Sequence, residues 1–126
     1  MELLTVANIA STQDTARQIA LDGHLLPFAI IAETQSAGRG RRGKSWDSPQ
    51  GGLWLTLALA VPSPETVRQS AIVAAHAVAS VVLPETGVRT LVKWPNDLLV
   101  KRRKVCGILA ETLVQSGTTT LLVGIG

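Results

Sequence analysis

The stretch KVCGILAETLVQSGTTTLLVGI, residues 104–125, decides the fold class of this chain. Apolar and β-branched residues fill 104–114 and 118–125, which is typical of two strands with buried faces. The residues between them, Gln115–Ser116–Gly117, favour a tight turn, so we expect a hairpin. Further strands are expected just before this hairpin. Strands therefore group at the end of the chain instead of alternating with helices.

Two helices are expected earlier in the chain. The first spans about 12–22, with hydroxyl and carboxylate side chains that can cap its start and a glycine that can end it. The second starts at Ser63–Pro64 and runs to about Leu83, because its apolar residues recur every three or four positions. Pro84 and Gly87 are expected to stop this helix.

The whole pattern predicts about seven strands and two helices. The strands before the C-terminal hairpin are expected over 2–9, 27–34, 53–61, 89–94 and 97–101. We therefore expect the α+β class, with a mixed β-sheet and helices packed on one face. A long segment, 35–52, carries five glycines, and long loops in compact domains tend to be functional or mobile.

Composition sets further limits. A chain of 126 residues with 46% hydrophobic and 17% charged residues suits one compact domain with its own core and argues against disorder. No apolar run approaches the ~20 residues of a membrane span, and the first residues lack the basic region of a secretory signal. The single cysteine, Cys106, cannot form an internal disulfide, so a reducing cytoplasm is the expected location.

Positive charge is concentrated in two short segments. The net charge is +3, and residues 39–44 and 101–104 each hold four of the 12 lysines and arginines. Such runs are often solvated surface, although a nucleic-acid binder would show them too. One Phe, three Trp and no Tyr leave little aromatic surface for stacking bases. Nucleic-acid binding is therefore the weakest of the functions considered.

The segment GRGRRGKSW, residues 38–46 and here named the Gly/Arg loop, is the first candidate site. Its glycines let the backbone turn N–H groups inward, and its arginines suit phosphate or carboxylate oxygens. The spacing of its glycines and lysine is not that of a Walker loop. Residues 38–43 do match G-x-G-x-x-G, but a strand is expected after them, whereas a dinucleotide-binding site needs a helix there. Trp46 either anchors the loop to the core or covers a planar ligand; a flexible surface turn is the alternative for the loop.

The segment VKWPNDLLV, residues 92–100, places a second group of polar residues between two expected strands. Lys93 and Asn96 could bind a ligand, and Asp97 could act as a base or bind a cation. An ordinary hairpin turn is the alternative, because proline, asparagine and aspartate are all common in turns.

Two further candidates are KVCGILAET, residues 104–112, and STQ, residues 11–13. Lys104 lies seven positions after Asp97, so a hairpin can bring the two side chains together; an exposed strand edge is the alternative for this lysine. Gly107 weakens a strand unless a ligand or another segment approaches it closely. Residues 11–13 can cap the first helix or hydrogen-bond a small polar ligand.

Together and in this order, these stretches resemble motifs of the catalytic domain of biotin protein ligases. The Gly/Arg loop is similar to GRGRxGRxW, KWPNDLLV to KWPNDL, KVCGILAE to K-x-x-GIL-x-E, STQ to S-T-N, and VGIG (123–126) to the start of VGIGxN. Lipoate ligases share the fold but lack the GRGRxGRxW loop, so they are the lesser match. The resemblance implies one catalytic domain over 1–126, with the class II aminoacyl-tRNA-synthetase-like fold.

The resemblance implies an ATP-dependent biotin–[biotin carboxyl-carrier protein] ligase. Members of this family first convert biotin and MgATP into biotinyl-5′-AMP and pyrophosphate. A lysine of a biotin carboxyl-carrier domain then attacks this anhydride and releases AMP. The implied small molecules are biotin, ATP and Mg²⁺. The implied protein partners are the carrier domain and, as in some members, a second copy of the ligase, whereas neither DNA nor a membrane is expected.

The resemblance also implies roles for individual residues. Catalysis is implied for Arg39, Arg41, Asp97 and Lys104. Biotin binding is implied for Ser11, Thr12, Gln13, Gln35, Gly38, Arg39, Lys104, Gly107 and Ile108. ATP binding is implied for Arg39, Arg41, Trp46, Lys93, Asn96 and Lys104. In these roles Lys104 bridges the biotin carboxylate and the phosphate, and Asp97 accepts the proton of the incoming lysine.

Several features depart from the family pattern. Gln13 stands where Asn is usual, and Lys44 and Ser45 replace the more common loop residues. The chain stops before the Asn of VGIGxN and lacks the small C-terminal β-barrel and a helix-turn-helix segment before residue 1, so we expect a fragment without a repressor role. A biotin-binding module without transfer activity therefore stays open as an alternative.

Overall fold

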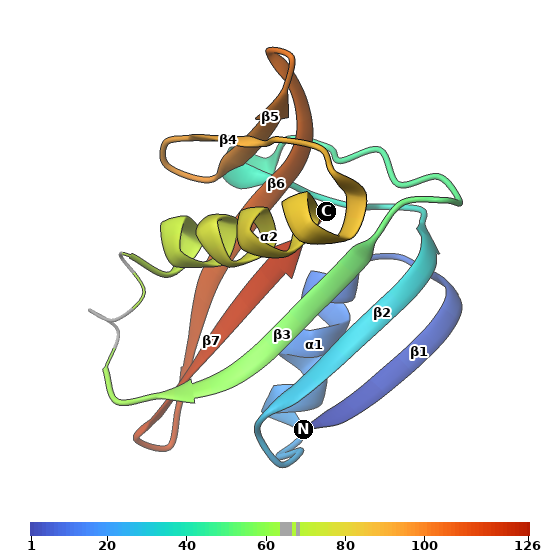
Figure 1. Ribbon diagram of the computed structural model, residues 1–126. Helices are drawn as coiled ribbons and strands as arrows, with labels where there is room; N and C mark the ends of the chain where they lie inside the picture. Colours follow the sequence, from blue (N-terminus) through green and yellow to red (C-terminus); the bar gives the residue numbers. More distant parts are fainter. Residues whose placement is uncertain (64–66, 68) are drawn as a thin grey trace.

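The structure, a computed structural model, describes residues 1–63, 67 and 69–126. In this part of the chain, one mixed sheet of seven strands carries two α-helices (Figure 1). The elements are β1 (Glu2–Ile9), α1 (Thr12–Leu21), β2 (Phe28–Gln35), the 3₁₀ turn η1 (Arg41–Gly43), β3 (Trp54–Val61), α2 (Ser70–Thr86), β4 (Leu91–Lys93), β5 (Asp97–Val100), β6 (Arg103–Gln115) and β7 (Thr118–Ile125). The strand order is β1-β2-β3-β7-β6-β5-β4. Strands β1 and β2 run parallel and the other neighbours antiparallel, so the predicted mixed sheet is confirmed.

The two helices lie on opposite faces of the sheet. On β7, Leu121 and Val123 pack in the cluster that contains Ala75 of α2, whereas Leu122 packs with Ala16 of α1. Because successive residues of a strand point to opposite faces, the two helices cover different sides, with α2 in front in Figure 1. The prediction that the helices pack on one face is therefore wrong. Leu121, Leu122 and Val123 are consecutive and all buried because both faces of β7 are covered at this point.

Helix α1 begins where the sequence predicts. Ser11 Oγ accepts a hydrogen bond from the backbone N–H of Asp14 (3.3 Å), which confirms the expected cap. Ala16 is fully buried against residues of β2, β3 and β7. This packing fixes the first turn of α1 at the end of the sheet where the polar residues gather.

Helix α2 ends later than the sequence predicts. Pro64 of the predicted start lies outside the described residues, and the helix is described from Ser70. It continues past Pro84, so the prediction that this proline stops it is wrong. A proline near a helix end removes one backbone donor, and the helix closes only at Gly87, where φ is 70° and the backbone N–H donates to a carbonyl of the last turn.

The C-terminal hairpin is confirmed, and the strand before it is shorter than expected. Strands β6 and β7 pair up to Gln115 opposite Thr118, and both residues of the turn between them have positive φ. The strand expected over 89–94 is reduced to Leu91–Lys93. The turn that follows it therefore leaves the sheet early and places its polar residues beside the middle of β6.

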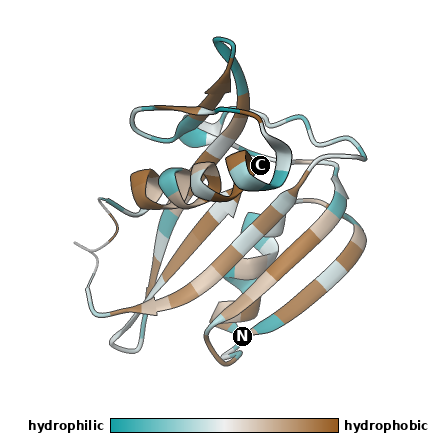
Figure 2. Cartoon of the chain, in the orientation of Figure 1, coloured by the Kyte–Doolittle hydropathy of each residue, from teal (hydrophilic) through white to brown (hydrophobic). Residues whose placement is uncertain are grey.

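Hydropathy follows this architecture (Figure 2). Hydrophobic residues lie along the central strands and α2, and hydrophilic residues gather at the tip of the β5–β6 hairpin, where Lys101 and Arg102 are exposed. Among the described residues, no helix has both the length and the hydropathy needed to cross a bilayer.

Candidate functional site

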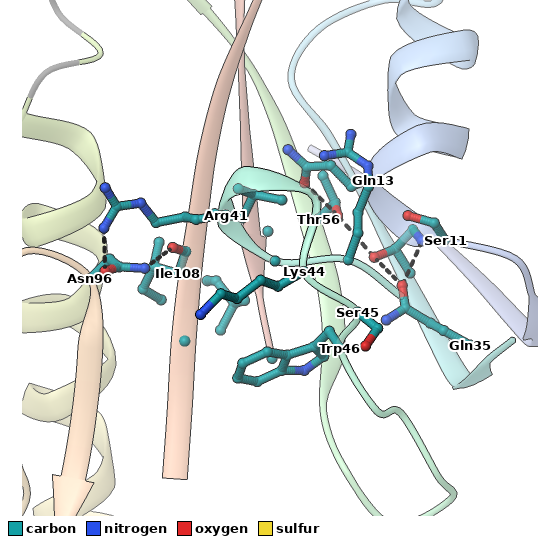
Figure 3. Close-up of a pocket in the computed structure, with 18 of the residues that line it drawn as sticks. Ser11, Gln13, Gln35, Arg41, Lys44, Ser45, Trp46, Thr56, Asn96 and Ile108 are labelled. Carbon is teal, nitrogen blue, oxygen red and sulfur yellow. Dashed lines mark hydrogen bonds between the residues drawn. The ribbon is translucent and has the colours of Figure 1, made fainter. Parts of the chain in front are cut away.

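A cavity of about 400 Å³ opens at the end of the sheet where α1 begins. Its walls come from the first turn of α1, the Gly/Arg loop, the start of β3, the middle of β6 and the end of β7. The residues singled out from the sequence that line it are Ser11, Thr12, Gln13, Gln35, Arg39, Arg41, Trp46, Asn96, Asp97, Lys104, Gly107 and Ile108. Figure 3 shows labelled members of this set facing one another from separate segments of the chain.

Two of the singled-out residues, Gly38 and Lys93, do not line this cavity in the described part of the chain. Gly38 lies behind it, where a Cβ would come 2.5 Å from Trp46 O and 2.9 Å from Gln35 Nε2, so only glycine fits between them. Lys93 is exposed on β4, opposite Asp97 in the strand ladder. Gly38 therefore has a packing role behind the cavity, and Lys93 lies outside the cavity.

Neutral polar side chains line one end of the cavity, here named the amide end: Thr12, Gln13, Gln35 and Thr56. Ser48 supports this end as a hydrogen-bond partner of Gln35. Gln35 Oε1 accepts bonds from the backbone N–H (2.7 Å) and hydroxyl (3.0 Å) of Thr12, and Gln35 Nε2 donates to Ser48 Oγ (2.8 Å). Thr56 is fully buried; its hydroxyl donates to Thr12 Oγ1 (2.9 Å) and lies 3.2 Å from Gln13 Oε1. This network holds α1 against β2 and β3 (Figure 3).

The Gly/Arg loop folds back on itself as a small hairpin. Trp46 N–H donates to Gly38 O (2.8 Å), and Gly40 N–H donates to Lys44 O (2.7 Å). At the tip, Gly43 has a φ of 71°, a left-handed conformation that favours glycine. The loop is therefore ordered by its own backbone, and its arginines are held at the mouth of the cavity.

Arg39 is held by two carboxylates, and we name Arg39, Glu111 and Asp14 the Arg39 clamp. Arg39 Nη1 and Nη2 donate to Glu111 Oε1 and Oε2 (2.7 and 2.8 Å), and Nε donates to Asp14 Oδ1 (2.9 Å). The bonds from Arg39, partly opposed by burial, lower the pKa of Glu111 from 4.5 to about 2. The bonds to Glu111 and then Asp14 raise the pKa of Arg39. Glu111 also accepts a bond from Gln13 Nε2 (3.1 Å) and lies 3.4 Å from Arg17.

Arg41 and Asn96 join the loop to the β4–β5 turn. Arg41 Nη1 donates to Asn96 Oδ1 (3.1 Å), and Asn96 Nδ2 donates to Ile108 O (2.9 Å), as Figure 3 shows. Ile108 N–H donates to Asn96 O (2.8 Å), so the buried Asn96 is fixed on β6. Arg41 itself is exposed, and one of its five N–H groups is engaged within the described residues, which leaves donors for an anion.

Lys104, Asp97 and Trp46 meet beside Gly107. Lys104 Nζ lies 2.8 Å from Asp97 Oδ1, at angles outside those of a hydrogen bond, which confirms that the β5–β6 hairpin brings the two together. The same ammonium lies 4.7 Å from the centroid of the Trp46 ring. Gly107 is required here, because a Cβ would come 2.9 Å from Trp46 and 3.1 Å from Lys104. Trp46 therefore anchors the loop on β6, and its buried Nε1–H has no acceptor among the described residues.

Three polar residues of the site were missed by sequence reasoning as binding or positioning groups: Asp14, Thr56 and Glu111. Thr56 interrupts the apolar stretch LWLTLALAV, and a lone hydroxyl in a buried strand is a usable signal. Glu111 ends the KVCGILAE motif, and the motif alone does not indicate a partner for this carboxylate. Asp14 is the carboxylate expected to cap the first helix, and its contact with Arg39 depends on tertiary structure.

The described residues do not build a metal site of their own. Within them, no group of three or more His, Cys, Asp or Glu side chains is placed to hold an ion. The carboxylates at or beside the cavity are ion-paired, Asp97 with Lys104 and both Asp14 and Glu111 with Arg39. These donors therefore do not fit a resident Mg²⁺.

Comparison with known sequences places the chain among ligases. It matches the model of the biotin/lipoate A/B protein ligase family over residues 6–126. It is 36% identical over 121 residues to the bifunctional ligase/repressor BirA of Bacillus spizizenii, covering 94% of this chain and 37% of that protein. It is 39% identical over 101 residues to the biotin–[acetyl-CoA-carboxylase] ligase of Paracoccus denitrificans, covering 77% of this chain and 42% of that protein.

Solved structures show the same fold. The biotin protein ligase of Leishmania major in complex with biotinyl-5-AMP is similar with a TM-score of 0.81 at 25% identity, covering 99% of this chain and 57% of that chain. The biotin acetyl coenzyme A carboxylase synthetase of Helicobacter pylori with bound biotinylated ATP gives 0.76 at 29% identity, covering 99% and 60%. The chain spans about two fifths of the length of the two sequence relatives named above. Because the family model spans nearly all of its residues, the chain belongs to the biotin/lipoate A/B protein ligase family.

Proposed function

We propose that this chain forms the biotin- and ATP-binding part of a biotin protein ligase and makes biotinyl-5′-AMP from the two. The observation that carries the proposal is the cavity, which sets a neutral amide end beside the cations Arg41 and Lys104 within about 400 Å³. A ligand with one uncharged polar end and one anionic end is complementary to this arrangement. The similar ligases of Leishmania major and Helicobacter pylori were solved with biotinyl-5-AMP and biotinylated ATP, which supports the choice of ligand.

The amide end suits the ureido ring of biotin. That ring offers one carbonyl acceptor and two N–H donors without charge, and amides and hydroxyls can match both kinds of group. In the proposal, Ser11, Thr12, Gln13 and Gln35 face the ring, and biotin lies along β6 at Gly107 and Ile108, all of which line the cavity. Gly38 contributes by leaving room for Gln35.

The cations suit the first chemical step. A biotin carboxylate oxygen attacks the α-phosphorus of ATP, the new C–O–P bond forms, and the bond to pyrophosphate breaks. Two anions must approach each other, so positive groups aimed at the developing charge lower the barrier. We assign this role to Arg41, Lys104 and the remaining donors of Arg39. Mg²⁺ would enter on the phosphates as part of the MgATP substrate.

The rest of the proposed nucleotide site surrounds these cations. Trp46 offers a ring face beside adenine and an unused buried N–H, and Asn96 lies where it can contact the phosphates. Lys93 would take part only at the margin of this site, because it is exposed outside the cavity.

In the second step, a carrier lysine would attack the carbonyl carbon of the anhydride and AMP would leave. The attacking amine must lose a proton, and Asp97 is the carboxylate that lines the cavity there. Asp97 is paired with Lys104, so the pair has to loosen as Lys104 moves toward the phosphate. We further propose that residues 1–126 act as one catalytic domain in the cytoplasm, with a biotin carboxyl-carrier domain as partner and a second copy of the chain as a further one.

A biotin-binding module without transfer activity is the second candidate. It is favoured by one observation, the coverage of only about two fifths of the related ligases. Such a module would hold biotin or its adenylate but leave a carrier domain unmodified.

Biotin-dependent exchange of pyrophosphate into ATP tests the proposal, with lipoate as the control acid. The assay isolates the first step and needs no carrier protein. Exchange with biotin and not with lipoate is the expected result. Exchange with lipoate alone would overturn the choice of acid, and biotin binding by calorimetry without exchange would favour the binding module.

A further inference from the structure

We propose that Glu111 is a positioning residue: it holds Arg39 and, through Arg39, keeps the Gly/Arg loop closed at the cavity. The inference rests on the geometry of the Arg39 clamp, and it rests on the proposed function only where activity is the readout.

The clamp joins the Gly/Arg loop to a strand of the sheet. Glu111 lies within β6, where its backbone pairs with Leu122 of β7. Arg39 lies in the loop, and its two terminal nitrogens each donate to a different oxygen of Glu111 (2.7 and 2.8 Å). This two-pronged arrangement fixes the plane of the guanidinium as well as its distance. The carboxylate of Glu111 on β6 therefore fixes the position of Arg39 and of the loop that carries it.

Glu111 contributes more to this clamp than Asp14 does. The Glu111 side chain is 25% exposed, whereas that of Asp14 is 55% exposed. Exposed ion pairs are screened by water and contribute little. Glu111 also accepts a bond from Gln13 and lies 3.4 Å from Arg17, so it has partners besides Arg39.

The other polar contacts of the Gly/Arg loop attach it to the sheet less firmly than the Arg39 clamp does. The bonds between Gly38, Gly40, Lys44 and Trp46 shape the loop but do not tie it to the sheet. The exposed Arg41 makes a single bond to Asn96 (3.1 Å). Just outside the loop, backbone bonds of Ala37 to Ala10 and of Gln35 to Ser48 tie its two ends to the sheet. Within residues 38–46, apart from the packing of Trp46 on Gly107, the clamp is thus the main side-chain link to the core.

Limited digestion with trypsin tests the inference without any ligand. Trypsin cleaves after Arg41, Arg42 and Lys44 at a rate set by how often the loop opens, and cleavage after Lys101 in the exposed hairpin serves as the reference in the same digest. In Glu111→Gln we expect loop cleavage to rise about tenfold relative to the hairpin, because a charge-assisted fork is lost.

A matched control removes the same charge elsewhere. Glu33 is exposed on β2 and has no ion-pair partner among the described residues. Glu33→Gln should digest like the wild type, and Asp14→Asn should fall between the two. Equal loop cleavage in the wild type and Glu111→Gln, with both folded by circular dichroism, would overturn the proposal.

The double variant separates positioning from a general structural role. If Glu111 acts through Arg39, then Arg39→Gln combined with Glu111→Gln should cleave no faster than Arg39→Gln alone. Additive effects would contradict the proposal. Should Glu111→Gln fail to fold, Arg39→Gln alone must still show faster loop cleavage, and an unchanged rate would reject the clamp.

Activity then separates this inference from the proposed function. In pyrophosphate exchange, Glu111→Gln should raise KM several-fold more than it lowers kcat, because the substrates have to close an open loop, which carries Arg41, whereas Lys104 stays in place on β6. If loop cleavage is faster in Glu111→Gln but the wild-type chain shows no exchange, the clamp is supported and the ligase proposal is rejected. If the wild-type chain shows exchange but Glu111→Gln is cleaved like the wild type, the ligase proposal is supported and the clamp is rejected.

Discussion

The amide end of the cavity is a buried network of neutral hydrogen-bonding groups, whereas the charged groups of the cavity form partly exposed ion pairs. At the amide end, Thr12, Gln35 and Thr56 bond mainly to one another, and Thr56 is fully buried. The charged groups are partly exposed and paired side chain to side chain, as Lys104 is with Asp97. A buried neutral network is costly to break, whereas an exposed ion pair exchanges partners easily. We therefore expect the amide end to control stability and the charged groups to control catalysis.

The largest expected effect is on catalysis. Lys104→Ala should lower biotin-dependent pyrophosphate exchange by at least about 100-fold, because it removes the cation that offsets two approaching anions. The free energy of unfolding should fall by about 1 kcal/mol, since Lys104 is partly exposed but the buried Asp97 Oδ1 loses its partner. Exchange kinetics and urea unfolding measure the two quantities.

Lys101→Ala is the control for this variant, since Lys101 is exposed at the tip of the β5–β6 hairpin. It should leave both quantities unchanged. Wild-type exchange in Lys104→Ala would remove Lys104 from the site.

The second effect is on stability. Thr56→Val keeps the side-chain shape but removes the single buried O–H that donates to Thr12 Oγ1 and lies near Gln13 Oε1. The free energy of unfolding should fall by about 1–3 kcal/mol. Urea unfolding of this variant should be compared with Thr34→Val, which removes an exposed hydroxyl bond to Asn8 and should cost less than about 0.5 kcal/mol. Equal losses in both variants would contradict the importance of the buried network.

The smallest effect concerns pH. The pKa of Glu111 is about 2 in the folded chain against an ordinary 4.5, so its pairing stabilises the fold above about pH 4.5 and is lost as pH falls toward 2. The groups facing it are Arg39, Arg17 and Gln13. Because the side chain is partly exposed, we expect a loss of at most about 1 kcal/mol.

Urea unfolding between about pH 6 and 3 checks this prediction. Glu111→Gln should have a flatter profile than the wild type over that range. A profile equally steep in the variant would assign the acid sensitivity to other carboxylates.

Local sequence predicted the secondary structure well where one short-range rule dominates. The hairpin at Gln115–Thr118 follows from its turn residues, and the cap at Ser11 from its hydroxyl. The end of α2 was misplaced because two stop signals, Pro84 and Gly87, compete, and only the glycine adopts the left-handed conformation that closes the helix.

For the cavity, the motifs predicted most of the lining residues but not the pairs that they form. The residues marked by the motifs gather in one cavity, Gly38 and Lys93 excepted. The partners of Arg39 could not be foreseen, because Asp14 and Glu111 lie 25 and 72 positions away along the chain. Contacts at such separations are set by strand order and helix placement.

The sequence by itself determined the strands, the hairpins, the start of α1 and the polar motifs, because these depend on neighbours within a few positions. Tertiary structure decided that the helices lie on opposite faces, since the alternation along β7 has to meet a helix on each side. Tertiary structure also decided that Arg39 is held by the clamp, whereas Arg41 makes one side-chain hydrogen bond among the described residues and has further N–H groups available. Both outcomes depend on which side chains the folded sheet brings within bonding distance.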